Sequence, residues 1–157
     1  MGSNVEPIIL LWTGGWDSTF RLLQLVADTD APIQPLYLVD EERPSTPREI
    51  DTMRTIRSMV EDRWPEARER LLPTDYGSYR ATTMEPHHRE MWEALKERGR
   101  VGLQYPILAS YAEQNGIDRM EVGILGSEFL RDILEECTVK DETPAGTTRV
   151  FASQGDG

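Results

Sequence analysis

Residues Thr13–Thr19, with the sequence TGGWDST, carry the residue types best suited to chemistry in this chain of 157 residues. Two adjacent glycines let the backbone adopt positive φ angles and leave room for an anion to approach. Because the segment opens directly into a predicted helix, the unpaired N–H groups of the first turn and the positive end of the helix dipole attract negative charge. The hydroxyl groups of Thr13, Ser18 and Thr19 add hydrogen-bond donors. The pattern predicts a phosphate-binding loop.

Asp17 is the unusual member of this TGGWDST loop, since a carboxylate repels phosphate. It fits there if it holds Mg²⁺, which prefers oxygen ligands and bridges phosphate groups. A role as a helix cap is the alternative, and the residues alone leave both open. The loop matches neither the Walker pattern GxxxxGK[ST] nor the dinucleotide motif GxGxxG. Trp16 is placed to lid the loop or to stack on a ligand, whereas Trp12 is predicted to be core.

The loop is positioned by a strand before it and a helix after it. Pro7–Trp12 is a continuous apolar run, typical of a strand buried on both faces. Asp17–Ala27 has apolar residues at helical spacing. Ile33–Val39 is a second apolar run, and Pro35 within it favours an edge position or a bulge. These segments form the first strand–turn–helix–strand unit of a parallel sheet.

Predicted helices and strands alternate along the rest of the chain. They are a helix at Arg48–Trp64, capped by Ser45 or Thr46 with Glu49 in its first turn, a strand at Arg70–Thr74, helices at Pro86–Arg98 and Tyr105–Asn115, a strand at Arg119–Leu125 and a helix at Glu128–Glu136. This alternation predicts an α/β fold, a three-layer parallel sheet covered on both faces. Ligands of such sheets bind at the carboxyl ends of the strands, where the strand order reverses.

The length fits one domain, which we place at residues 1–139. Residues 76–100 are polar and are predicted to be an insertion or lid. Residues 140–157 are rich in Thr, Gly and Asp, and we expect a flexible tail with one late strand around Arg149–Phe151.

The residues TGGWDST closely resemble the SGGxDS[ST] signature of the PP-loop ATP pyrophosphatases, with Thr13 in place of Ser and the hydroxyl retained. A second similarity covers residues 107–118, ILASYAEQNGID, followed by MEVG at residues 120–123. This second pattern is most like the 7-cyano-7-deazaguanine synthase branch of the family. The two similarities span residues 7–130, apart from the middle insertion.

The resemblance implies the Rossmann-like adenine nucleotide alpha hydrolase architecture and an enzyme that uses ATP and Mg²⁺. Such enzymes adenylate a small-molecule substrate and release pyrophosphate. By resemblance, Asp17 and Ser18 would be catalytic, with Asp17 on Mg²⁺. The residues implied to contact the nucleotide, together with Thr13 and Trp16, are Gly14, Gly15, Ser18, Thr19, Leu38, Val39, Gly123 and Gly126, the last in a turn with Ser127. The zinc site of the synthases needs four cysteines, whereas this chain has one, Cys137, so the specific reaction does not carry over.

The formal net charge of −11 disfavours nucleic acid and anionic membranes as partners. We see no signal peptide, and the longest apolar run, Ile8–Trp12, is too short to span a bilayer. The expected location is the cytoplasm and the expected partner is a small-molecule substrate; the resemblance also allows a homodimer. The alternative function is a non-catalytic nucleotide- or phosphate-binding module, or a subunit that needs a partner chain.

Several other polar residues are candidates of lower rank. Neighbouring residues on a helix point about 100° apart, so His87 and His88 are predicted not to form a chelate but to be solvated or to cap the helix. Glu41 and Glu42 are interpreted as part of a solvated loop rather than as metal ligands. The remaining candidates, interpreted as surface charges rather than as phosphate ligands, are Arg48, Arg131 and Lys140.

Overall fold

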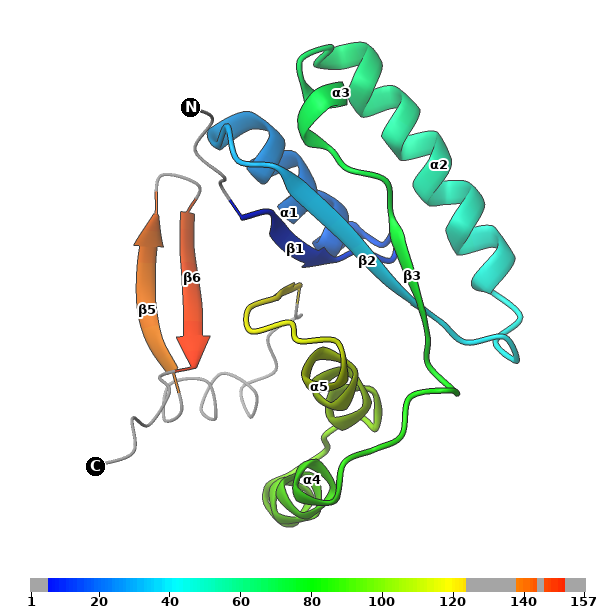
Figure 1. Cartoon of the computed structure of the whole chain (residues 1–157), viewed down its shortest axis with the longest axis vertical. Helices are drawn as coiled ribbons and strands as arrows, with labels where there is room; N and C mark the ends of the chain where they lie inside the picture. Colours follow the sequence, from blue (N-terminus) through cyan, green and yellow to red (C-terminus); the bar gives the residue numbers. More distant parts are fainter. Residues whose placement is uncertain (1–5, 124–137, 144–145, 152–157) are drawn as a thin grey trace.

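The computed structural model describes residues 6–123, 138–143 and 146–151 (Figure 1). Its elements are β1 (Ile8–Leu11), α1 (Trp16–Asp28), β2 (Ile33–Val39), α2 (Thr46–Arg63), α3 (Ala67–Arg70), β3 (Asp75–Ser78), α4 (Pro86–Arg98), α5 (Gln104–Gln114), β4 (Glu121–Val122), β5 (Thr138–Thr143) and β6 (Gly146–Phe151). The predicted strands at Pro7–Trp12 and Ile33–Val39 are confirmed, as are the helices predicted after the glycines, at Pro86–Arg98 and at Tyr105–Asn115.

Four strands form a parallel sheet in the order β3-β2-β1-β4. The predicted α/β class is therefore confirmed, and the sheet is compatible with a Rossmann-like fold. β1 pairs with β2 on one side and with β4 on the other, so the strand order reverses at β1. The TGGWDST loop follows the carboxyl end of β1 and lies at this switch point, the place where open α/β sheets bind ligands.

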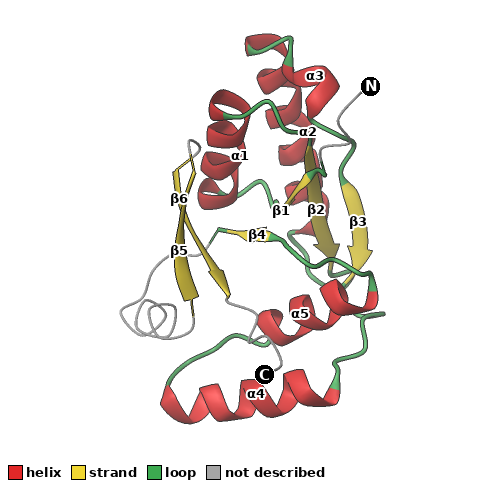
Figure 2. Ribbon diagram, turned by 60° about the vertical axis from the view of Figure 1, so that its left-hand side comes forward, coloured by secondary structure: helices red, strands yellow, loops and turns green. Residues whose placement is uncertain are grey.

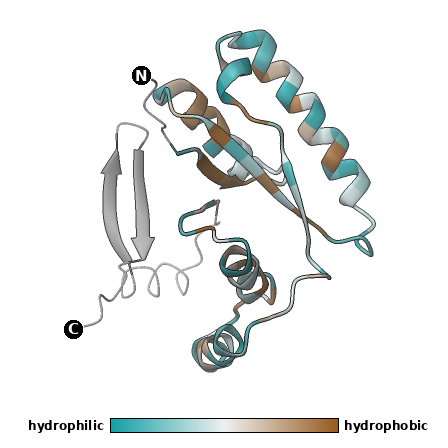
Figure 3. Ribbon diagram, viewed as in Figure 1, coloured by the Kyte–Doolittle hydropathy of each residue, from teal (hydrophilic) through white to brown (hydrophobic). Residues whose placement is uncertain are grey.

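The main core fills the face of the sheet that α1 and α2 cover. Apolar side chains from β1 and β2 meet those of both helices in one buried cluster, and Figure 3 shows the apolar residues of β1 and β2 in brown. Its fully buried members include Leu10, Trp12, Leu22, Leu25, Ile33 and Met53. Burial of such side chains stabilises by about 1.5–3 kcal/mol each. The strand and the helix that flank the loop are thus held by the core, which confirms Trp12 as a core residue.

The opposite face of the sheet packs against α5. Leu36 of β2 is buried, as are Ile107 and Leu108 of α5. A Cβ atom added at Gly77 of β3 would lie 2.4 Å from the Tyr111 ring of α5, so this glycine allows the helix to approach the sheet closely. Figures 1 and 2 both place α5 between the sheet and α4. Helices therefore cover both faces, as a three-layer arrangement requires.

Pro35 does not mark an edge strand, contrary to the sequence-based prediction, because β2 lies between β1 and β3. The carbonyl oxygens of Ile33 and Val39 accept hydrogen bonds from the chain on the β3 side. Odd-numbered residues of β2 therefore face β3, and Pro35 turns its missing N–H in the same direction. That position lies between the isolated bridge at Ile33 and the start of regular pairing at Asp75. The ladder is interrupted there, so the proline costs no hydrogen bond.

The third strand lies later in the chain than predicted. Ala67–Arg70 forms the short helix α3, and Asp75–Ser78 forms β3, whereas a strand was expected at Arg70–Thr74. The sheet therefore includes the first residues of the segment predicted as an insertion, 76–100. Two further helices, α4 and α5, complete the crossover from β3 to β4.

The C-terminal residues that the structure describes form an antiparallel pair, β5 with β6. The late strand expected around Arg149–Phe151 is confirmed, and its partner strand, Thr138–Thr143, was not predicted; the flexible tail stays a prediction. Gly126, Ser127, Arg131 and Cys137 lie outside the described residues, as does the predicted helix at Glu128–Glu136. Among the helices that the structure describes, none is both long and apolar enough to cross a bilayer.

Candidate functional site

Two glycines shape the turn between β1 and α1. Gly14 has a φ of 72°, in the left-handed region that favours glycine. A Cβ atom at this position would lie 3.1 Å from Cγ of Met53 and 3.5 Å from the carbonyl oxygen of Glu49, both in α2. Gly15 has a φ of −75° and occupies the N-cap position of α1 without a side-chain cap. Gly14 is therefore required by its conformation, whereas Gly15 has an ordinary φ and a Cβ atom there would crowd only the Thr13 hydroxyl, at 3.3 Å.

The hydroxyl groups of the loop hold its shape from within. The Thr13 backbone N–H donates to Ser18 Oγ at 3.3 Å, and the Gly15 N–H donates to Thr13 Oγ1 at 3.4 Å. Ser18 Oγ donates to the Gly15 carbonyl at 3.4 Å, and Ser18 is 6% exposed. Thr19 Oγ1 accepts a bond of 3.1 Å from the Trp12 indole, which ties the loop to the core. These contacts preorganise the backbone around the N-terminal start of α1.

The first turn of α1 presents unpaired backbone donors. Its first helical hydrogen bond runs from the Thr19 N–H to the Gly15 carbonyl at 2.9 Å. The N–H groups of Trp16, Asp17 and Ser18 precede that bond, so helix geometry supplies them with no carbonyl one turn earlier. Such donors, at the positive end of the helix dipole, form an anion-binding site. The Asp17 side chain is exposed in the same turn, beside these donors.

Gly123, which lies 105 positions after Ser18 in the sequence, contacts this turn directly. A Cβ atom at Gly123 would lie 3.1 Å from the Ser18 backbone nitrogen and 3.3 Å from Asp17 Cβ. Any larger residue would cover the Ser18 amide. The glycine therefore lets the end of β4 approach the first turn of α1 closely, at the point where the predicted phosphate donors lie.

An ion pair that the sequence analysis missed fastens β4 to α1. Arg21 Nε lies 2.6 Å from Glu121 Oε2, and a second nitrogen of the guanidinium lies 3.0 Å from Oε1. The two side chains are 14% and 22% exposed, so water screens this bidentate pair only weakly. It holds Gly123 against the loop. A pairing across 100 positions leaves no local signal in one sequence.

Two further residues implied to contact a nucleotide, Leu38 and Val39, lie at the same edge of the sheet. Leu38 and Val39 end β2, beyond the point where Leu36 pairs with Leu11. Trp16 is 92% exposed, so its role as a lid or stacking platform stays a prediction.

The start of α2 is held under the loop by a network around Glu49. The Tyr37 hydroxyl donates to Glu49 Oε2 at 2.7 Å, and burial together with this bond raises the pKa of Tyr37 to about 12. Ser45 Oγ donates to Glu49 Oε1 at 2.9 Å, and Arg43 pairs with the same oxygen. Ser45 occupies the N-cap position of α2 but makes no side-chain cap, and Thr46 Oγ1 donates to the Asp40 carbonyl, so the predicted capping roles are wrong.

The acidic loop after β2 is tied to the segment after β3. Glu41 accepts a hydrogen bond of 2.9 Å from Ser78, and Glu42 pairs with Arg80 at 2.8 Å. Both carboxylates are exposed, as the interpretation as a solvated loop requires. The contacts with Ser78 and Arg80 favour a structural role for the acidic loop.

Two basic residues considered as phosphate ligands lie elsewhere: Arg48 is exposed on α2, and Lys140 lies in β5.

His87 and His88 lie close together, contrary to the prediction that neighbouring helical residues diverge. Their ring centroids are 4.1 Å apart, and both rings approach Glu113 of α5. The rings converge because a carboxylate on the packed neighbouring helix attracts both, and the side-chain torsions offset the 100° between their Cα positions. Burial lowers the pKa of His88, and the neighbouring His87 lowers it further.

Comparison of the chain with models of known protein families, with curated proteins and with solved structures gives no match. The resemblance to the PP-loop ATP pyrophosphatases therefore depends on the residues themselves, chiefly TGGWDST at 13–19 and MEVG at 120–123.

Proposed function

We propose that this chain binds Mg·ATP at the TGGWDST loop and adenylates a small-molecule substrate with release of pyrophosphate. The observation that carries the proposal is the convergence of three unpaired amides, Gly14 and Gly123 at the switch point of a parallel sheet. The loop sequence adds the resemblance to PP-loop enzymes, and with it the adenine nucleotide alpha hydrolase architecture.

Each residue has a defined task in this proposal. The N–H groups of Trp16, Asp17 and Ser18 bind phosphate oxygens, and the dipole of α1 adds to their attraction. The exposed Asp17 carboxylate would hold Mg²⁺, an ion that supplies charge neutralisation for a pyrophosphate leaving group. Substrate oxygen attacks the α-phosphorus, the bond to the bridging oxygen breaks, and pyrophosphate leaves. The contribution of the protein is mainly to position and to neutralise charge.

Calorimetry with Mg·ATP tests the binding step. The wild-type chain should bind Mg·ATP, and Asp17→Ala should weaken this binding by about tenfold while leaving AMP binding nearly unchanged. Asp28→Ala, at the opposite and exposed end of the same helix, is the matched control and should bind like wild type. Absence of heat and of a thermal shift with Mg·ATP would remove the proposal.

A second candidate function is a nucleotide-binding subunit that completes its site with a partner chain. The observation that favours it is an exposed apolar pair beside the loop, since Trp16 is 92% and Phe20 62% exposed, one turn apart on α1. Pyrophosphate release from Mg·ATP separates the two functions. With a pool of small carboxylic acids and ammonia, an enzyme releases pyrophosphate and loses this activity in Asp17→Ala, whereas a subunit binds ATP or AMP without turnover.

A further inference from the structure

Three potential metal ligands meet where α4 begins and α5 ends, away from the loop. His87 Nε2 lies 2.9 Å from Glu113 Oε2, and His88 Nε2 lies 3.6 Å from the same oxygen. The ligand atoms of all three residues lie within 4.8 Å of one another. Four-coordinate zinc with bonds of about 2.0–2.1 Å keeps its ligand atoms about 3.3 Å apart. In the histidine–glutamate cluster, His87 with His88 and Glu113, the two nitrogen–oxygen distances of 2.9 and 3.6 Å are close to that spacing.

A buried hydroxyl fixes the orientation and the tautomer of His88. Ser110 is 0% exposed and uses its single proton in a bond of 2.8 Å to the Pro106 carbonyl. Its oxygen also accepts the Glu85 N–H at 3.0 Å. The 3.0 Å contact between Ser110 Oγ and His88 Nδ1 therefore needs a proton on the nitrogen. Neutral His88 then carries its lone pair on Nε2, which faces Glu113. Histidine ligands of metals are held by outer-shell partners in this way.

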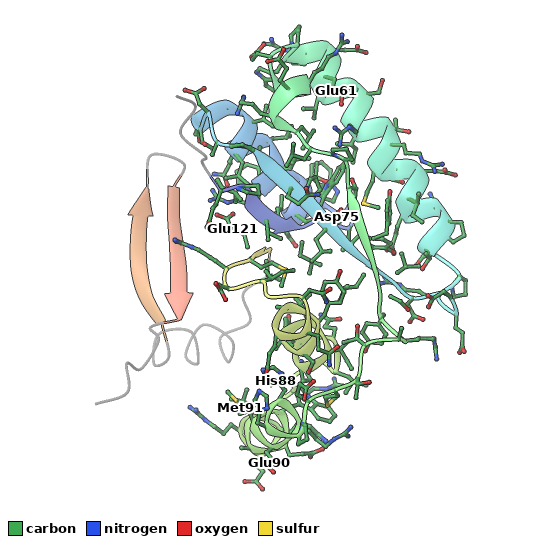
Figure 4. The ribbon with its side chains drawn as sticks, viewed as in Figure 1. Glu61, Asp75, His88, Glu90, Met91 and Glu121 are labelled. Atoms are coloured by element: carbon green, nitrogen blue, oxygen red, sulfur yellow. The ribbon has the colours of Figure 1, made fainter. Side chains whose placement is uncertain are left out.

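The two helices that carry the cluster are tied together beside it. Gln114 Nε2 donates at 2.7 Å both to the Thr83 carbonyl and to Glu85 Oε1, which joins the end of α5 to the start of α4. The His88 side chain is 17% exposed, whereas those of His87 and Glu113 are 54% and 53% exposed. The cluster is thus anchored on its inner side and open to water on its outer side, where a solvent molecule has room to act as a fourth ligand. Figure 4 shows His88 between the two helices.

We propose that His87, His88 and Glu113 form a binding site for a divalent transition-metal ion, with Zn²⁺ as the ion that suits two imidazoles and one carboxylate. A simple ion pair explains the contact between His87 and Glu113. It does not explain why a second histidine is turned by a saturated, buried serine to place an unprotonated nitrogen toward the same carboxylate. Mg²⁺ prefers six oxygen ligands and does not fit this set.

Titration of the full, metal-free chain with Zn²⁺ alone tests the site, with calorimetry as the measurement and no affinity tag present. We expect one Zn²⁺ per chain, and a loss of affinity of at least tenfold in His88→Ala and in Glu113→Gln. Glu90→Gln, on the exposed outer side of α4, is the control for the loss of one carboxylate and should bind like wild type. Asp17→Ala should also leave Zn²⁺ binding unchanged, because the loop is a separate site.

X-ray absorption of the zinc-loaded chain gives a second readout, with two imidazole ligands expected in the wild type and one in His87→Ala. Circular dichroism without metal confirms that each variant is folded. The proposal is overturned if wild type binds no Zn²⁺, if the cluster variants bind as wild type does, or if the spectrum shows fewer than two imidazoles.

Discussion

The TGGWDST loop consists of seven consecutive residues, whereas the histidine–glutamate cluster joins the start of α4 to the end of α5. In the loop, backbone amides are the binding groups, and their direction follows from a glycine turn and a helix start. In the cluster, side chains are the binding groups, and their convergence follows from the packing of two helices. The difference teaches that a site made of backbone can be recognised in a sequence, whereas a site made of side chains on separate elements cannot.

The largest expected effect concerns the tertiary contact on which the loop itself depends. Arg21→Met leaves the weakly exposed Glu121 carboxylate without its bidentate partner, and we expect the free energy of unfolding to fall by about 3 kcal/mol. Urea denaturation measures the loss. The exposed pair of Arg54 with Asp51 provides the control, because Arg54→Met should cost less than about 0.5 kcal/mol.

A double variant, Arg21→Met with Glu121→Met, should recover part of the lost stability, because no charge then stays unpaired. Equal losses in Arg21→Met and Arg54→Met would show that the pair does not fasten β4 to α1. The conformation of the loop would then depend less on its contact with β4 than the structure indicates.

The two glycines of the loop allow a matched test of its backbone. Gly14→Ala places a Cβ atom in the left-handed region and 3.1 Å from Met53, so we expect a loss of about 1.5 kcal/mol. Gly15→Ala meets no conformational constraint, because φ is negative, and its Cβ atom would displace only the Thr13 hydroxyl, a side-chain atom at 3.3 Å. Its effect on the free energy of unfolding should stay within about 0.5 kcal/mol. Thermal denaturation of the two variants side by side is the measurement, and equal melting temperatures would contradict the geometry of the turn.

The smallest expected effect concerns the positioning of His88 in the cluster. Ser110→Ala removes the acceptor of the Nδ1 proton while leaving all three proposed metal ligands unsubstituted. We expect the Zn²⁺ affinity to fall about tenfold. Nitrogen chemical shifts of the metal-free chain supply a readout that a loss of stability would not move. They should report the Nδ1–H tautomer of His88 in wild type and a shift toward Nε2–H in the variant. An unchanged tautomer would show that Ser110 does not orient the ring.

Much of the fold could be predicted because its signals are local. The apolar run of β1, the glycine turn and the spacing of α1 specify a strand–turn–helix unit without reference to distant residues. The third strand could not be placed in this way, since Asp75–Ser78 has the polar sequence DYGS and is a strand because it pairs with β2. Pairing also explains Pro35, which reads as an edge signal but lies in an interior strand where the ladder is interrupted.

The sequence by itself determined the TGGWDST loop, its flanking strand and helix, and the α/β class, because backbone conformation and amphipathic spacing are properties of neighbouring residues. Only the tertiary structure decided that Gly123 contacts the loop, that Arg21 pairs with Glu121, and that His87 and His88 converge on Glu113. Those contacts join positions from 25 to 106 residues apart, and packing of separate elements sets their distances.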